Sequence, residues 1–259
     1  MKIVINPKYK HLTQFVESVP SIFPTQGESI YKARNEIKVF NVDGIAINVK
    51  AYKVPIFINR IVYSFFRETK AQRAYDYALK LLSLGVETPA PIAYIIETRG
   101  GLVARTYFIS LHTPLDGNFR LFGDVSIPFE TVRPLAEAFA RYTAELHEKQ
   151  VLHVDYSPGN ILFEKKEDGS YRFSLIDINR MKFCEVDERE GCKAFARMWG
   201  IEEFFRTVAR VYAEARGFDV ERCTKLILDF QNEEQAYRDR KYARRDKIAA
   251  FKEKLKGLF

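Results

Sequence analysis

The sequence predicts an α+β protein whose first part is rich in strands and whose second part is mainly helical. The turns Asp43-Gly44 and Arg99-Gly100-Gly101 each separate two strand-like runs, which is typical of β-hairpins. All ten prolines occur at or before Pro158, so no proline interrupts a helix in residues 159–259. A chain of 259 residues with 47% hydrophobic content can bury a full core. Its length accommodates one two-lobed unit as well as two small domains.

Periodic patterns place the elements of the first part. The strand-like segments are residues 3–5, 30–40, 45–52, 92–97 and 102–109. A polar link punctuated by Pro20 and Pro24 follows the first of them. A helix is predicted over residues 70–84, ending at Gly85, and its apolar face consists of Ala71, Tyr75, Ala78 and Leu82. Residues 55–66 form an insertion to which the sequence assigns no function.

The second part begins with a loop over residues 112–128 and a helix over residues 131–150. The apolar face of that helix consists of Leu135, Phe139, Tyr142 and Leu146. Strands at 161–163 and 171–176 flank Asp168-Gly169, a strong hairpin signal. Helical patterning then includes Phe195, Trp199, Phe204, Phe205, Val208 and Tyr212.

Three polar residues of the second part suggest phosphotransferase chemistry. Asp155 and Asn160 lie in His153-Val154-Asp155-Tyr156-Ser157-Pro158-Gly159-Asn160, and Asp177 follows the next strand pair. Phosphoryl transfer needs a carboxylate that takes or orients a hydroxyl proton, and two oxygen ligands that hold Mg²⁺ against the phosphates of ATP. The spacing matches the kinase pattern H-x-D-x-x-x-x-N followed by D-x-G. The alternative is an ordinary polar turn in which these side chains bond locally.

The first part supplies candidates for nucleotide binding. Lys50, in Ile47-Asn48-Val49-Lys50, stands where the V-A-I-K lysine of kinases stands, and Lys53 is the nearest competitor. Asp76 on the predicted helix is the best acidic partner for Lys50, with Glu68 as a weaker alternative. Backbone groups near residues 109–111 are expected to meet the adenine edge.

The pattern also departs from that of protein kinases. No G-x-G-x-x-G occurs between the first strands, where only Gly27 and Gly44 are available, so Arg34 and Asn35 are alternative donors to the phosphates. Asn179 replaces the glycine of D-F-G. No A-P-E motif follows Asp177, which favours a small or lipid-linked acceptor over a peptide.

Charge is concentrated near the end of the chain. The formal net charge is +7, and residues 236–259 hold nine basic and three acidic residues. This basic C-terminal helix is either a solvated helix or a cationic surface that docks on anionic lipid or on nucleic acid. An apolar stripe lies beside the charges and consists of Ile248, Phe251, Leu255 and Leu258. Such a stripe is typical of interfacial helices, and it is equally compatible with packing on the protein's own core.

Targeting and metal signals are weak. The chain has no apolar run of 18 residues, and its first residues do not form a signal peptide, so we expect a cytoplasmic protein. Three cysteines and four widely spaced histidines suggest neither a disulfide framework nor a zinc site.

Three segments together resemble one family. They are residues 79–94, which contain Leu84-Gly85-Val86-Glu87-Thr88-Pro89-Ala90-Pro91, then residues 153–162, and then Ile176-Asp177-Ile178-Asn179-Arg180. Over roughly residues 28–185 the chain is similar to the lipopolysaccharide core kinases. The resemblance implies a bilobal protein-kinase-like fold, with a β-rich N-lobe over residues 1–109 and a mainly helical C-lobe over residues 110–259.

The resemblance also implies roles. Asp155 would be the catalytic base, Asn160 and Asp177 the Mg²⁺ ligands, and Lys50, with Asp76 as its partner, would bind ATP. His153 would brace the loop. The expected reaction is ATP- and Mg²⁺-dependent phosphorylation of Kdo or heptose in the lipopolysaccharide inner core, with no nucleic-acid partner.

The catalytic-loop motif alone is shared with aminoglycoside, choline and RIO-type kinases. Two alternatives therefore remain, an atypical RIO-like protein kinase and a pseudokinase scaffold that binds a partner through its basic tail.

Overall fold

The computed structural model describes the backbone of residues 1–115 and 117–256, and the side chains of these residues as far as Ile248. The chain forms two compact units. The first consists of residues 1–117, 162–166 and 172–181, and the second of residues 118–161, 167–171 and 182–259.

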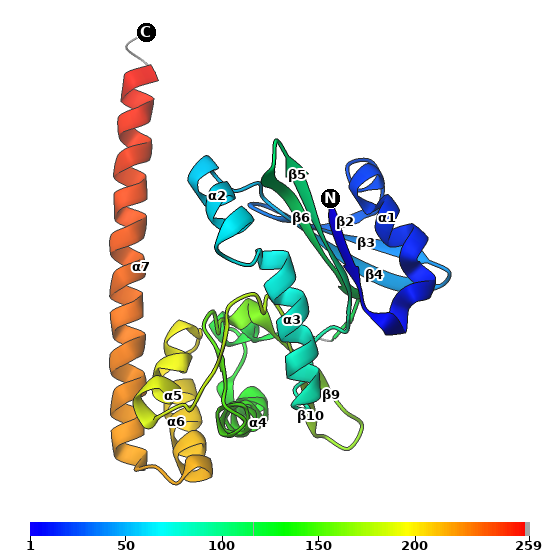
Figure 1. The fold of residues 1–259 in the computed structure, drawn as a ribbon. Coiled ribbons are helices and arrows are strands. Elements are labelled where there is room, and N and C mark those ends of the chain that lie inside the picture. Colours follow the sequence, from blue (N-terminus) through cyan, green and yellow to red (C-terminus); the bar gives the residue numbers. More distant parts are fainter. Residues whose placement is uncertain (116, 257–259) are drawn as a thin grey trace. The chain divides into compact units, whose positions relative to one another are not determined.

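A six-stranded sheet forms the first unit (Figure 1). Its order is β1-β5-β6-β4-β3-β2, and the neighbouring strands are antiparallel. The strands are β1 (Lys2–Ile5), β2 (Glu28–Lys32), β3 (Glu36–Val42), β4 (Ile45–Tyr52), β5 (Pro91–Arg99) and β6 (Leu102–Leu111). The hairpin β5–β6 turns through Gly100 and Gly101, which both have positive φ, as the sequence predicted.

Helices pack on the two faces of this sheet. The 3₁₀ helix η1 (Pro7–Leu12) and α1 (Thr13–Ile22) bury Leu12, Val16 and Val19 against alternate residues of β4 and β6. Helix α3 (Lys70–Ser83) packs on β5 and β6, where the ring of Tyr75 meets that of Tyr94 edge to face at 5.3 Å. The sheet thus has one face under α1 and another under α3 (Figure 1).

Three predictions for the first unit need correction. The proline-punctuated link is helix α1, because Leu12, Val16 and Val19 recur at helical spacing and pack into the core despite Pro20 inside the helix. The single strand predicted over residues 30–40 is two strands, β2 and β3, with residues 33–35 as the turn between them.

The apolar face of α3 also differs from the prediction. Leu82 is exposed, and Leu81 is fully buried in its place. The insertion contains a helix, α2 (Phe57–Phe65), which the sequence patterns did not predict.

The second unit is mainly helical. Its helices are η2 (Phe119–Gly123), α4 (Phe129–Glu148), η3 (Pro158–Asn160), α5 (Glu188–Ala194), η4 (Phe195–Arg197), α6 (Glu202–Arg216) and α7 (Val220–Lys256). Aromatic side chains form much of its core: Phe119, Phe139, Phe195, Phe204 and Tyr212 are all fully buried. Trp199 was predicted to be helical but lies between η4 and α6 and is 41% exposed, because Met198 ends η4 in extended geometry.

Two small sheets complete the list of strands. A two-stranded sheet pairs β8 (Val151–His153) with β11 (Met181–Phe183), and a three-stranded sheet has the order β10-β9-β7. Its strands are β7 (Gly117–Asn118), β9 (Ile161–Lys165) and β10 (Tyr171–Leu175). The turn between β9 and β10 contains Gly169 at φ 83° and the Ser170 N–H bonded to Asp168, as predicted for this hairpin. The predicted α+β fold, with a strand-rich first part and a helical second part, is confirmed.

The basic tail belongs to helix α7. Residues 239–248 are all exposed. The side chains of Phe251, Leu255 and Leu258 lie outside the described residues, so the predicted apolar stripe is described only at the exposed Ile248. Within the described ranges, none of the helices has the length and apolar composition needed to cross a bilayer.

Candidate active site

Lys50 is positioned by the alternation of strand β4. Val49 and Ala51, its neighbours, are buried in the core beneath α1. Successive side chains of a strand point to opposite faces. Lys50 and Tyr52 therefore share the other face, and the Lys50 Nζ lies 5.4 Å from the centre of the Tyr52 ring.

The cation of Lys50 meets the carboxylate of Asp177. Lys50 Nζ lies 2.6 Å from Asp177 Oδ1, with side chains 12% and 34% exposed. Asn179 Nδ2 donates to the same oxygen at 2.6 Å. Lys53, the alternative lysine, is exposed immediately after β4 ends. Of the two lysines, the structure thus places Lys50 beside the candidate metal carboxylate.

The backbone at Asp177 adopts a left-handed conformation, with φ 54°. Such a conformation costs a non-glycine residue about 1 kcal/mol or more, and aspartate tolerates it better than most. The preceding strand is anchored, since the Leu175 N–H donates to the Glu87 carbonyl at 3.0 Å and Thr88 Oγ1 donates to the Leu175 carbonyl at 2.7 Å. The left-handed residue of this turn is therefore the carboxylate itself and not Asn179, which replaces the kinase glycine.

Asp76 does not pair with Lys50, contrary to the sequence prediction. Among the described residues, the ion pair of Lys50 is with Asp177. Burial raises the pKa of Asp76, and the nearby Glu68 raises it further, whereas a hydrogen bond from Gln72 and the charge of Lys2 lower it. Gln72 lies one turn before Asp76 on the same face of α3, and the helix buries its other face against β5 and β6.

Other cations surround Asp177 within the first unit. Burial lowers the pKa of Lys70, and the charges of Arg34, Arg180 and Arg73 lower it further, against an opposing effect of Asp177. Burial likewise raises the pKa of the Tyr52 hydroxyl, with Asp177 adding to the rise. This surplus of positive charge suits phosphate groups.

The predicted adenine-binding segment lies at the end of β6. The Leu111 N–H donates to the Ala90 carbonyl at 2.9 Å, and the His112 N–H donates to the Ala46 carbonyl at 2.9 Å. These two N–H groups of the predicted adenine-binding segment therefore already donate to backbone carbonyls.

In the second unit, buried contacts hold the loop that carries Asp155. The Tyr156 hydroxyl lies 2.9 Å from Thr143 Oγ1 on α4, and its ring stacks on Phe139. His153 is 3% exposed, and its Nδ1 accepts the Asp155 N–H at 3.1 Å. That bond requires an unprotonated Nδ1. His153 therefore braces this loop, as expected from the sequence.

Asn160 is fixed by the same loop. Its Nδ2 donates to the Asp155 carbonyl at 2.9 Å. Next to it, Gly159 lies against the Arg120 guanidinium, which would be 2.7 Å from a Cβ atom at that position. A larger residue at 159 would have to displace Arg120.

Asp155 forms an ion pair with Arg197, which the sequence patterns did not predict. Glu234 of α7 lies 3.7 Å from the Arg197 Nε, and Arg238 Nη2 donates to the Arg197 carbonyl at 3.0 Å. Arg238 Nε also bonds Glu234 at 3.2 Å. A continuous polar chain thus connects the candidate base with the C-terminal helix.

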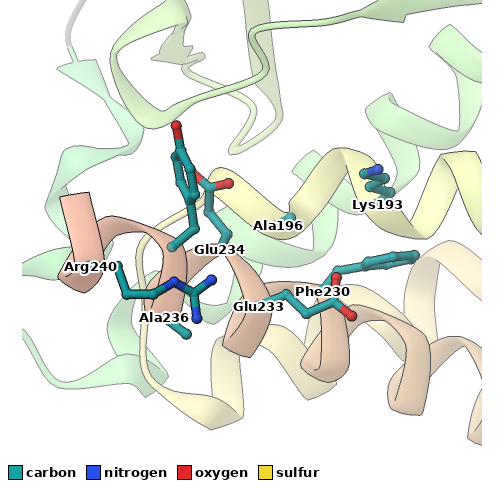
Figure 2. Close-up of a pocket in the computed structure, with 8 residues that line it drawn as sticks. Lys193, Ala196, Phe230, Glu233, Glu234, Ala236 and Arg240 are labelled. Atoms are coloured by element: carbon teal, nitrogen blue, oxygen red, sulfur yellow. The ribbon is translucent and has the colours of Figure 1, made fainter.

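Figure 2 shows the surface where α7 meets α5 and η4. An open cavity of about 490 Å³ lies there, lined by Lys193, Ala196, Phe230, Glu233, Glu234, Ala236, Tyr237 and Arg240. The Arg189 guanidinium lies 4.8 Å from the centre of the Phe230 ring, and the Lys193 ammonium lies 5.7 Å from it. These contacts fix the first half of α7, and with it Glu234, against the segment that carries Arg197.

Each of the two candidate metal ligands, taken within its own unit, offers an oxygen atom of the type that Mg²⁺ binds beside phosphates. Because its Nδ2 is anchored, Asn160 keeps Oδ1 without a protein partner among the described residues. Asp177 offers a partly exposed carboxylate. No group of three or more His, Cys, Asp or Glu residues that could hold a metal occurs in the described part of the chain. Mg²⁺ at phosphate-transfer sites needs only one or two carboxylates, because phosphates and waters complete its shell.

Comparison with known proteins identifies the family. The chain matches the lipopolysaccharide kinase (Kdo/WaaP) family over residues 31–200. None of the curated proteins matches it significantly. A solved structure described as WaaP in complex with acyl carrier protein is similar over 91% of this chain and 99% of that chain, with a TM-score of 0.62 and 17% identity.

At this identity the structural likeness shows the fold alone, which is kinase-like. The family match is stronger, because it covers more than half of the chain and contains Lys50, Asp155, Asn160, Asp177 and Arg197. The chain therefore belongs to the lipopolysaccharide kinase (Kdo/WaaP) family and is a phosphotransferase of the kinase class.

Proposed function

We propose that this kinase transfers the γ-phosphoryl group of ATP, with Mg²⁺, to a hydroxyl of Kdo or heptose in the lipopolysaccharide inner core. The observation that carries the proposal is the ion pair between Lys50 and Asp177. It sets a cation for phosphate binding beside a carboxylate of the type that holds Mg²⁺. The family match supports lipopolysaccharide as the acceptor class.

Each residue has a proposed role. Asp155 orients the acceptor hydroxyl and takes its proton, and the ion pair with Arg197 fixes the direction of its carboxylate. Lys50 binds the phosphates. Asn160, through Oδ1, and Asp177 hold Mg²⁺, which neutralises charge on the phosphoryl oxygens when bound. The remaining contribution of the chain is positioning, since phosphoryl transfer demands little covalent chemistry from the protein.

The basic second half of α7 is a proposed site of contact with anionic membrane. Its support is the exposure of residues 239–248, which contain Arg240, Lys241, Arg244, Arg245 and Lys247. Removing residues 239–259 is expected to weaken binding to anionic liposomes. Unchanged liposome binding by a truncated chain of normal thermal stability would exclude this role.

The test of the reaction is transfer of labelled γ-phosphate from ATP to purified lipopolysaccharide, and in parallel to protein alone. The intact chain is compared with Asp155→Asn and Asp177→Asn. Labelling of glycolipid that both substitutions abolish is the expected result. Labelling of polypeptide alone would indicate a RIO-like protein kinase, and no transfer together with no Mg²⁺-dependent ATP binding would indicate a scaffold.

A further inference from the structure

Helix α2 is attached to the sheet by its polar side. Arg60 Nε donates to the Val103 carbonyl at 2.7 Å, and its Nη2 donates to the Arg99 carbonyl at 3.2 Å. One turn later, Ser64 Oγ accepts the Val103 N–H at 2.9 Å. Residues 60 and 64 lie on one helix face, so this face is held on the β5–β6 hairpin by hydrogen bonds.

The opposite side of α2 is apolar and faces solvent. Four aromatic or aliphatic side chains at or beside the helix ends are between 64% and 81% exposed: Phe57, Ile58, Phe65 and Phe66. With Ile61 and Val62 they recur in pairs every four residues, which defines one face. No residue of this helix is buried. A surface helix ordinarily turns its apolar stripe to the core, and here the orientation is reversed.

A cationic cavity adjoins this helix within the same unit. It has a volume of about 300 Å³ and lies between the 33–35 turn, the end of β4, α2 and the start of α3. Arg34, Lys53 and Lys70 line it, together with Asn35 and Asn59, and no carboxylate does. The Lys53 N–H donates to Asn35 Oδ1 at 3.3 Å, which ties the turn to the end of β4.

In the described parts of the protein, none of Arg34, Lys53 and Lys70 forms an ion pair. Asp177, whose charge acts on Lys70, is itself paired with Lys50. In the second unit, by contrast, Arg133, Arg197, Arg210, Arg216, Arg222 and Arg238 all form ion pairs with carboxylates. Grouped cations without counter-charge repel one another. An anionic ligand would relieve this repulsion.

The start of α3 adds to the positive potential of the cavity. Thr69 and Lys70 line it, and the first turn of α3 contains no acidic residue. Thr69 caps the Gln72 N–H, so the helix end is ordered. The positive end of the helix dipole therefore acts in the same direction as the lysine and arginine charges.

We propose that α2 and this cavity form a docking surface for anionic lipid, in which the apolar side chains of α2 enter the lipid layer and the cavity takes a headgroup phosphate or carboxylate. The juxtaposition of an outward apolar face with unpaired cations is the arrangement of interfacial helices. The inference deepens the proposed function and rests on it for the lipid-linked acceptor. It assigns the initial membrane contact to α2, separately from the basic tail.

The test is flotation of the full chain with vesicles of phosphatidylglycerol and phosphatidylcholine, against vesicles of phosphatidylcholine alone. The double variant Phe57→Ser/Phe66→Ser is expected to bind anionic vesicles about tenfold more weakly. Lys53→Gln should bind anionic vesicles about fivefold more weakly, and this difference should vanish at high salt. The three substituted side chains, Phe57, Phe66 and Lys53, are exposed, so thermal unfolding should be unchanged.

Matched controls stand on other surfaces. Val125→Ser removes an apolar side chain that is 90% exposed, and Lys166→Gln removes an exposed lysine; both should bind as the parent does. Arg244→Gln/Arg245→Gln tests the tail separately. Parent-like binding by the α2 and Lys53 variants would overturn the inference, whether or not the tail variant binds. Failure of the parent chain to bind anionic vesicles would overturn the inference too.

The proposed function has its own readout. Asp155→Asn should lose phosphoryl transfer and keep vesicle binding. If the parent shows no transfer but vesicle binding still depends on α2, the docking surface stands and the acceptor assignment fails.

Discussion

The two carboxylates proposed for catalysis, Asp177 and Asp155, are each paired with a cation, but the two pairs are built differently. Lys50 precedes Asp177 by 127 residues and comes from the middle of a sheet strand whose backbone is fully paired. Arg197 follows Asp155 by 42 residues and comes from a short 3₁₀ helix that is held by α7. One pair therefore depends on the sheet and the other on the packing of a C-terminal helix.

This difference indicates which substitutions should affect nucleotide binding and which should affect the candidate base. Substitutions near Lys50 should act on nucleotide binding and leave the remainder of the first unit intact, because the neighbouring core faces α1. Substitutions in α7, far along the chain from Asp155, should act on the orientation of the candidate base. The predictions below test this division.

The largest effect is expected for Asp155→Asn. The amide keeps the shape of the carboxylate but cannot take a proton, so kcat should fall about a thousandfold. The measurement is the rate of phosphate transfer from ATP to lipopolysaccharide. A fall of less than tenfold, with normal ATP binding, would remove Asp155 from the role of base.

Lys50→Met is expected to lower the affinity for ATP and the transfer rate about a hundredfold. The substitution removes the cation beside Asp177 and keeps most of the apolar stem. Lys53→Met is the matched control for nucleotide affinity, because Lys53 lies after the end of β4. Equal losses of ATP affinity in the two variants would contradict the assignment of Lys50.

The sequence predicts candidates for those proposed roles that follow from local spacing. Asp155 and Asn160 share one loop, and Lys50 follows a strand alternation that is evident in Ile47-Asn48-Val49. The predicted partner of Lys50 was wrong: Lys50 pairs with Asp177, and the rotation of α3 about its axis, which sets the side to which Asp76 points, is fixed by packing against the sheet. Local patterns contain no information about such a rotation.

Two other elements were missed for related reasons. Helix α1 has Pro20 in its interior, which the patterns treat as a break, and only burial of Val16 and Val19 on the sheet stabilises it as a helix. Arg197 belongs to no motif, and its role arises because Glu234 and Arg238 approach it from α7. The sequence places Arg238 in a basic tail, whereas in the structure its guanidinium donates to the Arg197 carbonyl.

Arg197→Gln is expected to lower kcat about tenfold while the KM for ATP stays the same. The reason is that the guanidinium orients Asp155 and belongs to a different unit from Lys50. Arg197→Lys should restore part of the rate, because the charge returns without the planar geometry of the guanidinium.

Glu234→Gln tests whether α7 supports Arg197. It weakens the support of Arg197 without touching Asp155, so its effect on kcat should be smaller than that of Arg197→Gln. A parallel change in KM for ATP in either variant would indicate a structural disturbance that reaches the first unit.

Acid should destabilise the helical unit through His147. Burial lowers the pKa of this histidine to about 3, with the charge of Arg216 adding to the effect, and its Nδ1 lies 2.8 Å from the Tyr212 hydroxyl. The unfolded chain then binds a proton that the folded chain does not, between the ordinary histidine pKa and about 3. The free energy of unfolding is therefore unaffected by His147 above about pH 6.5. Below that pH it falls by about 1.4 kcal/mol per pH unit.

The measurement is denaturant unfolding at a series of pH values from about 7 to about 4. In the variant His147→Gln, which keeps a polar group near Tyr212, the steep loss of stability below about pH 6 should become shallower by that amount. Identical pH slopes for the two chains would show that His147 does not titrate on unfolding.

The smallest effect is expected for Tyr156→Phe, which removes the hydroxyl bonded to Thr143 and keeps the ring stacked on Phe139. Thr143 Oγ1 still donates to the Phe139 carbonyl at 2.8 Å, so no buried donor is left without a partner. The cost should therefore be only about 1 kcal/mol of unfolding free energy. Tyr237→Phe, on the exposed surface of α7, is the control and should change nothing. Since the Tyr156 hydroxyl anchors the loop between His153 and Asn160 to α4, a loss of transfer rate larger than the loss of stability explains would show that this anchor orients Asp155 as well as stabilising the fold.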